Sequence, residues 1–466
     1  MQLGAVLGIM LAAVLPVAAL ACALPPSIIM TLPTGYYMLG AAVTVAITGL
    51  LATTPRLVPK MTARTLITRR VLVPVTVTSY AAWIVLLALV LVGFAGARDP
   101  MHNLLTLTVW AVIWVALPMG CMIFGNLWRA INPWTAPIRL TRRILGRTGG
   151  IGLERFGHLP AVIGLFGFFW FYIISMSPDD PRTLAIATAT YWTVIFVLGV
   201  AEGEAWLEQG EFLTAYLGFL SKIAPFWLEI SEGHATLKLG WPGTQVLRMS
   251  PLSVSAIAFV TLSLAGLTFD GLNETFWYMG LIGENPLEFT GRSAVVGVNS
   301  LGLVATWGLT AATVLCALRL GPLLQSEAVL ITTGGPAPNP ARPNLMPVML
   351  SFLAIAAGYH AAHYLTTLLT AGQYMLAALN DPLFRGDDFL GLPAFYVSMG
   401  FLTDRWIMTL IWNAQFTLIL GAHILAVILA LRLTPAGTQA RVHFPLTALM
   451  VGYTVLGLWL LASPSG

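Results

Sequence analysis

The sequence has few charged residues and many apolar ones. Charged side chains make up 9% of its 466 residues, whereas an ordinary soluble domain carries about 25%. Hydrophobic residues make up 58%, and a water-soluble fold cannot bury that much apolar surface. The composition therefore excludes an ordinary soluble protein and predicts one whose main partner is the lipid bilayer.

Cysteine and the common catalytic motifs are scarce or missing. Cys22, Cys121 and Cys316 lie far apart within apolar stretches, so they form no CxxC pair and no disulfide framework. We expect buried thiols that act as small hydrophobic side chains. No phosphate-binding loop, GxSxG elbow, HExxH motif or dinucleotide fingerprint occurs. ATP use and covalent serine chemistry therefore have no support, and we expect no nucleic-acid partner.

Long apolar runs dominate the chain. A helix needs about 20 apolar residues to cross the hydrocarbon core. This length predicts an all-α, polytopic transmembrane bundle that forms a single domain over residues 1–466. The first span ends in AALACALPP, which suits a signal-peptidase site, so ten spans remain if it is a cleaved leader. About eleven spans are predicted, near 3–24, 36–54, 71–96, 103–126, 159–177, 183–204, 252–270, 295–318, 346–377, 405–431 and 444–462.

The loop charges predict an orientation. Lys and Arg are retained on the cytoplasmic side, and one set of alternate loops carries 18 of the 23 basic residues. The other set is acidic and has only five arginines, at 98, 182, 292, 385 and 405. The asymmetry holds along the whole chain. It predicts an N terminus inside, a C terminus outside and a multi-pass protein of the bacterial inner (plasma) membrane.

Three loop segments have a character of their own. Residues 126–147 mix tryptophan with arginine and predict a segment in the anionic cytoplasmic interface. Residues 205–251 predict a cytoplasmic insertion, an interfacial helix followed by a hairpin. Residues 378–404 predict an extracytoplasmic loop that could cap a cavity.

Ionisable side chains at membrane depth indicate function, because burying them in lipid is costly. In the ninth span, His360 and His363 are three apart and share a helix face. The tenth span carries Gln415 and His423. A loop joins these spans, so they are predicted to be antiparallel neighbours with histidines at comparable depth.

We call the predicted cluster of His360, His363, Gln415 and His423 the seam. Other polar side chains surround it. Asp270 and Glu274 end the seventh span, and Asp381 begins the loop after the ninth. Gln373 and Tyr374 lie toward the outer end of the ninth span. Together with Gln415 and Glu274 they are candidate substrate or second-shell contacts.

Three interpretations of the seam are open. His360, His363 and His423 could bind a divalent transition metal such as Zn, Cu or Fe, with Asp270 or Asp381 as a catalytic carboxylate. Alternatively, the same side chains could hydrogen bond between helices and hold the bundle together. A proton relay or a substrate contact is a third possibility.

A second group of carboxylates lies at the cytoplasmic end of the sixth span. The group could form a cation site, or its members could be ordinary solvated side chains. It comprises Glu202, Glu204, Glu208 and Glu211.

Several short motifs in a shared order carry a resemblance to a known family. They are LPTGYYMLGAAVTVAITGLL, DPMHNL, GNLWRAINPW, AWLEQGEF with APF, LTFDGLNET, HYLTTLLTAGQ with NDPL, and WNAQ with GAH. Together they resemble prokaryotic membrane proteins labelled fenitrothion hydrolase-like.

The resemblance implies hydrolysis of an organophosphorus triester and points to three side chains, His363, Gln415 and His423. The family often has a histidine where this chain has Cys22 and Ala23, and another where it has Leu431. We therefore expect either a membrane-embedded hydrolase of small apolar esters or a transporter, metal-handling or accessory protein without catalytic activity.

Overall fold

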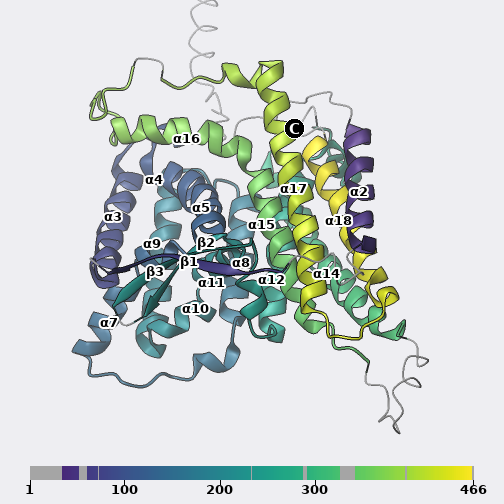
Figure 1. Ribbon diagram of the computed structural model, residues 1–466. Helices are drawn as coiled ribbons and strands as arrows, with labels where there is room; N and C mark the ends of the chain where they lie inside the picture. Colours follow the sequence, from purple (N-terminus) through teal and green to yellow (C-terminus); the bar gives the residue numbers. More distant parts are fainter. Residues whose placement is uncertain are drawn as a thin grey trace, which may run out of the picture.

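The computed structural model describes residues 34–51, 60–71, 73–231, 233–286, 291–325, 342–393 and 396–463. These residues are mostly helical (Figure 1). Seven helices in this part of the chain are long and apolar enough to cross a membrane, or eight if one bent pair counts as a single span. The predicted first span lies outside the described residues.

Each of the other ten predicted spans coincides with helix. Two of these helices, α2 and the α8–η4 pair, are apolar but shorter than the seven candidate membrane spans. The helices are α2 (Thr34–Leu51), α3 (Val75–Ala95), α4 (Leu104–Leu107) continued by η2 (Thr108–Ala116) and α5 (Leu117–Phe124), α8 (Leu159–Phe169) with η4 (Trp170–Ile174), α9 (Pro181–Glu202), α12 (Val254–Asn273), α14 (Arg292–Leu323), α15 (Phe352–His363), α16 (Leu365–Asn380), α17 (Arg405–Leu433) and α18 (Phe444–Ala462).

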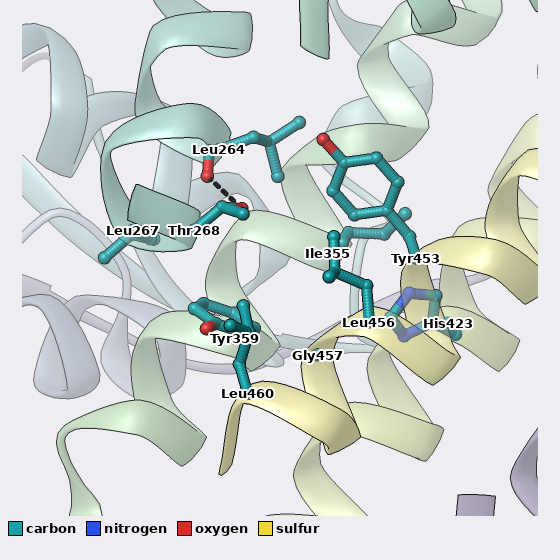
Figure 2. A pocket seen from close by; sticks show the side chains of 10 residues that line it. All are labelled: Leu264, Leu267, Thr268, Ile355, Tyr359, His423, Tyr453, Leu456, Gly457 and Leu460. Carbon is teal, nitrogen blue, oxygen red and sulfur yellow. Dashed lines mark hydrogen bonds between the residues drawn. The ribbon is translucent and has the colours of Figure 1, made fainter. Parts of the chain in front are cut away.

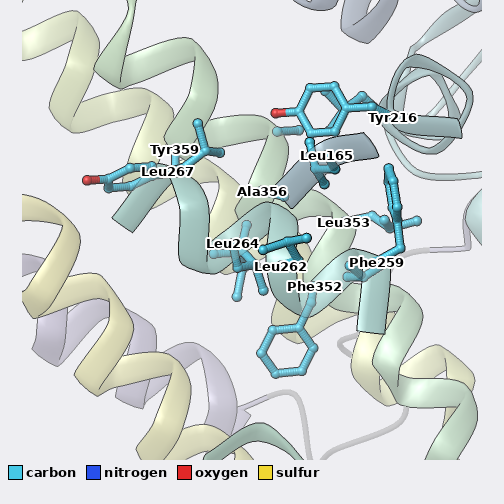
Figure 3. Close-up of a cluster of buried hydrophobic side chains, with 14 of the residues drawn as sticks. Leu165, Tyr216, Phe259, Leu262, Leu264, Leu267, Phe352, Leu353, Ala356 and Tyr359 are labelled. Carbon is cyan, nitrogen blue, oxygen red and sulfur yellow. The ribbon is translucent and has the colours of Figure 1, made fainter. Parts of the chain in front are cut away.

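Helix α12 occupies the centre of the bundle. The most apolar window of this helix is 72% buried, more than that of any other candidate span. It contacts α8, α14, α15 and α18. Figure 3 shows part of the resulting core, where Phe259, Leu262 and Leu267 of α12 lie among side chains of neighbouring helices. A polar side chain on α12 is therefore held inside protein.

Helices α15 and α17 pack closely and antiparallel, as predicted. A Cβ at Gly358 would lie 2.2 Å from Ala422 Cβ and 2.9 Å from the carbonyl oxygen of Leu418. Farther along α15, Ala362 meets Gln415, which lies earlier on α17. Glycine at 358 is thus what allows the two backbones to approach.

The predicted ninth span is broken. Helix α15 and the 3-10 turn before it, η10 (Met346–Ser351), meet α16 at a bend of 54° at Tyr364. Helix α16 then packs on α4 and η2 and lies across one end of the bundle (Figure 1). The bend places the last residues of α15 at an interruption of the helix, beside α12.

Short helices and a small sheet lie among the connections. The helices are α6 (Trp128–Ile131), α7 (Thr135–Ile144), α10 (Leu207–Gly210), α11 (Phe212–Leu220) and α13 (Phe276–Leu281). The predicted hairpin is confirmed as β2 (Phe226–Ser231) and β3 (His234–Gly240). An unpredicted strand, β1 (Ala63–Arg70), pairs antiparallel with β3 and completes a sheet of order β1-β3-β2.

Candidate functional site

The candidate site forms where the last turn of α12 meets the bend between α15 and α16. Asp270 is 5% exposed. Its Oδ2 atom lies 2.9 Å from Nε2 of His363 and accepts a hydrogen bond from the Tyr364 hydroxyl at 2.6 Å. Because the carboxylate accepts, Nε2 of His363 carries the hydrogen and its Nδ1 presents a lone pair. The prediction that Asp270 and His363 belong to one site agrees with this geometry.

The three members of the site differ in exposure. The His363 side chain is 19% exposed, whereas the Asp270 side chain is 6% exposed and Tyr364 is 2% exposed. The imidazole is therefore the member that a molecule from outside can reach. The carboxylate and the phenol lie behind it and fix its orientation.

A tyrosine and a glycine complete the surroundings of His363. The Tyr359 ring stacks on the imidazole, with centroids 5.7 Å apart and planes 11° apart. A Cβ at Gly271 would lie 2.9 Å from the Tyr359 hydroxyl oxygen and 3.6 Å from Cε1 of His363. A side chain at 271 would therefore intrude between the phenol and the imidazole. Among the residues described, the buried Tyr359 hydroxyl has no hydrogen-bond partner.

His360 lies on the other side of Tyr364 and has different partners. Its Nδ1 atom is 2.9 Å from the Tyr216 hydroxyl of α11, and its ring meets the edge of Trp114 in η2 at 5.3 Å. The residue is fully buried. It therefore joins α15 to α11 and η2, as the interhelical interpretation expects.

His423 faces a small cavity between α12, α15, α17 and α18. Its Nδ1 atom lies 2.9 Å from the Ile419 carbonyl oxygen, so Nδ1 donates to that oxygen and Nε2 holds the lone pair. The cavity is about 10 Å³, is also lined by Thr268, Tyr359 and Tyr453 (Figure 2), and has room for about one water-sized molecule. It is too small for an organophosphorus triester.

The predicted metal-ligand set is not assembled in this arrangement. Each of the three histidines uses a ring nitrogen for a different partner: Tyr216, Asp270 or the Ile419 carbonyl. Within the described ranges, no three His, Cys, Asp or Glu side chains gather as a metal site requires. The donor set of His360, His363 and His423 therefore does not fit one ion. Metal binding by this protein stays a prediction.

Two predicted glutamines hold the end of α15 and the loop after α16 in place. Gln415 is 8% exposed and donates from Nε2 to the Ala362 carbonyl at 2.9 Å, one residue before His363. Gln373 on α16 accepts a hydrogen bond from the Ser398 backbone at 2.9 Å. Gln415 thus positions the end of α15, and Gln373 fastens the predicted outer loop to α16.

The remaining predicted residues lie at the margin. Asp381 accepts hydrogen bonds from the backbone N–H groups of Arg385 at 2.8 Å and Gly386 at 2.7 Å. These contacts close its own loop, and its role as a catalytic carboxylate stays a prediction. Glu274 follows α12 with an exposed side chain, and Tyr374 is half-buried on α16.

Sequence reasoning missed the tyrosines of the site. Tyr364 follows His363 directly, and Tyr359 precedes it by four residues, so it lies on the same helix face. Tyrosine is common near membrane interfaces, and neither position stood out. The available signal was the spacing of two hydroxyl-bearing rings around a histidine in an apolar segment.

A second buried carboxylate occurs at Glu211, before α11. Its Oε1 atom accepts from the Tyr191 hydroxyl and from the Leu213 backbone at 2.8 Å. Its Oε2 atom accepts from the Thr214 backbone at 2.7 Å and from the Thr214 hydroxyl at 2.6 Å. Glu211 is completely buried, so the expectation that it is solvated is wrong.

The other members of that carboxylate group have separate roles. Glu202 accepts hydrogen bonds from the backbone of Ile151, Gly152 and Glu154. Glu204 forms a two-bond ion pair with Arg139, at 2.8 and 2.7 Å. The carboxylates of these residues thus satisfy local donors instead of forming a shared cation site.

The fold and the buried polar site define a helical protein with several helices able to span a membrane. Comparisons with protein-family models, with curated proteins and with solved structures found no match to this chain. The function must therefore be argued from the site.

Proposed function

We propose that this protein is a membrane-embedded hydrolase that cleaves apolar organophosphorus triesters, with His363 as general base and Asp270 as the group that orients it. The observation that carries the proposal is the 2.9 Å contact between Asp270 Oδ2 and His363 Nε2. A carboxylate on one ring nitrogen fixes the tautomer and stabilises the imidazolium that forms when the other nitrogen takes a proton.

The reaction requires one proton transfer and one displacement. A water molecule gives a proton to Nδ1 of His363 while its oxygen forms a bond to phosphorus. The bond from phosphorus to the aryloxide breaks, and the aryloxide leaves with the electron pair. The imidazolium then returns its proton to solvent. General-base catalysis of this kind contributes about 10²- to 10⁴-fold to a rate.

The surroundings of His363 suit an apolar substrate. The imidazole is partly exposed, whereas the rings and carboxylate behind it are buried. A triester is uncharged and dissolves in the bilayer, so it could approach from the lipid side. The cavity beside His423 is too small for it, so the substrate must bind at the exposed edge of His363.

The direct test uses purified protein in proteoliposomes and an aryl organophosphorus triester that releases a coloured nitrophenolate. We expect release above that of empty liposomes and a loss of about 100-fold in His363→Gln, because the glutamine amide is not a base at neutral pH. His102→Gln is the matched control, since His102 pairs with Asp99 outside the site, and it should retain the wild-type rate. Wild-type release equal to that of empty liposomes would refute the proposal.

A proton-linked transporter is the second candidate, and the broken helix favours it. Interrupted helices and buried ionisable side chains mark binding sites in many transporters, and the 54° bend at Tyr364 adjoins the Asp270–His363 pair. Proton entry into proteoliposomes under an imposed membrane potential tests this function. Entry that depends on Asp270, without any triester cleavage, would favour transport over hydrolysis.

A further inference from the structure

We infer that α7 and the turn after it form a binding surface for anionic phospholipid headgroups. This inference is independent of the proposed function. It rests on three observations: where α7 lies, which of its side chains are already paired, and which remain exposed.

Two arginines and a glycine contact fix α7 at the ends of two candidate spans. Arg139 donates to Thr76, in the first turn of α3, at 3.2 Å, and to Glu204, just beyond α9. Arg142 donates to the Val200 carbonyl, in the last turn of α9, at 2.8 Å. Ile138 packs on Gly199, where a Cβ would lie 2.3 Å from its Cδ1 atom.

These contacts set the depth of α7 in a membrane. A span begins and ends near the lipid headgroups, so α7 lies at headgroup level beside α3 and α9, at the lower left of Figure 1. The first half of α7 is buried, at Ala136, Pro137 and Ile138, whereas its last turns are exposed.

The exposed second half of α7 combines apolar and basic groups. Leu140, Arg143 and Ile144 follow at helical spacing; Leu140 is 46% exposed and Ile144 is 74% exposed. Arg143 and Arg147 are exposed and have no ion pair among the described residues, unlike Arg139.

The chemistry of this surface matches one partner. Residues 139–156 include five arginines and a single carboxylate, Glu154. Exposed leucine and isoleucine can enter the acyl boundary while guanidinium groups bind phosphate oxygens. A free phosphate ion would use the arginines but gain nothing from Leu140 and Ile144. The combination therefore points to a phospholipid.

The test is lipid selectivity of the full-length protein in vesicles, measured by electron spin resonance of spin-labelled lipids. Wild type should immobilise phosphatidylglycerol in preference to phosphatidylcholine. In the double variant Arg143→Gln/Arg147→Gln, we expect the association constant for phosphatidylglycerol to fall at least about fivefold. The effect should shrink as salt is added.

Two further variants separate the alternatives. Arg385→Gln/Arg405→Gln removes the same charge elsewhere, and it should leave the selectivity unchanged. Leu140→Ser/Ile144→Ser keeps the charge but should reduce the immobilised lipid. An equal loss in both arginine pairs, no preference in wild type, or full displacement by inorganic phosphate would overturn the inference.

Discussion

Asp270 and Glu211 are both buried carboxylates that accept a tyrosine hydroxyl, yet their surroundings differ. Glu211 accepts from two backbone N–H groups and two hydroxyls that the fold holds in place. Asp270 accepts from one hydroxyl and from an imidazole, a group that can act as both acid and base. The Glu211 contacts tie α11 to α9, whereas the Asp270 contacts orient a titratable group that is partly exposed.

The difference shows how to interpret a buried charged residue in this helical bundle. Burial alone does not indicate function, because Glu211 is more deeply buried than Asp270. What distinguishes Asp270 is the chemistry of its partner and the position of that partner at a helix bend. The comparison predicts that one carboxylate matters most for activity and the other most for stability.

The largest expected effect is on activity in Asp270→Asn. The amide keeps the shape of the carboxylate but carries no charge to stabilise an imidazolium, so triester cleavage should fall about 100-fold. The thermal midpoint in detergent should change little, because the Asn oxygen still accepts a hydrogen bond. An unchanged rate per folded protein would remove Asp270 from the mechanism.

The next effect is on stability in Glu211→Gln. The new NH₂ group must face donors that now lack an acceptor, which costs about 2 to 3 kcal/mol. We expect a clearly lower thermal midpoint, with the activity of the folded fraction preserved. Glu208→Gln, at an exposed position nearby, is the control and should leave the midpoint unchanged.

A smaller effect is expected when α15 is pushed away from α17. In Gly358→Ala the added methyl meets Ala422 and a backbone oxygen, so stability should fall by about 1 to 2 kcal/mol. Activity should fall with it, because the bond from Gln415 to Ala362 stretches. Gly372→Ala has no heavy atom within 4 Å of its new methyl, so it should be neutral or slightly stabilising. Equal effects of the two changes would contradict this view of the helix contact.

The smallest effect concerns pH and the sheet, which contains neither of these two carboxylates. The hydrogen bond from Lys238 lowers the pKa of Glu229 below its ordinary 4.5. A lowered folded-state pKa means that its stabilisation is present above 4.5 and is lost as the pH falls through the folded value. Fluorotryptophan NMR of Trp227, whose Nε1 donates to Glu229 at 3.0 Å, should report this loss. Glu229→Gln should abolish the acid transition in that signal.

Much of the fold could be predicted because apolar runs and loop composition determine helices directly. All ten predicted spans within the described residues are helical, and the hairpin predicted within residues 205–251 is present as β2–β3. Strand β1 was missed because its exposed residues show no pattern of burial. The bend at Tyr364 was missed because neither glycine nor proline marks it.

The site was predicted only in part, for a physical reason. Asp270 and His363 stood out because ionisable groups are rare in apolar spans. Which groups bond to which depends on helix rotation, and single-sequence reasoning does not determine that rotation. The three histidines therefore seemed able to share an ion, and Asp381 seemed able to reach the site, whereas each has a local partner.

The central claim is that Asp270 and His363 act together on a substrate while Glu211 only supports the fold. It is tested most directly by the rate of triester cleavage in wild type, Asp270→Asn and Glu211→Gln, each divided by the amount of folded protein. We predict a loss of about 100-fold in Asp270→Asn and a wild-type rate in Glu211→Gln. Equal rates in all three proteins, or equal losses in the two variants, would contradict the claim.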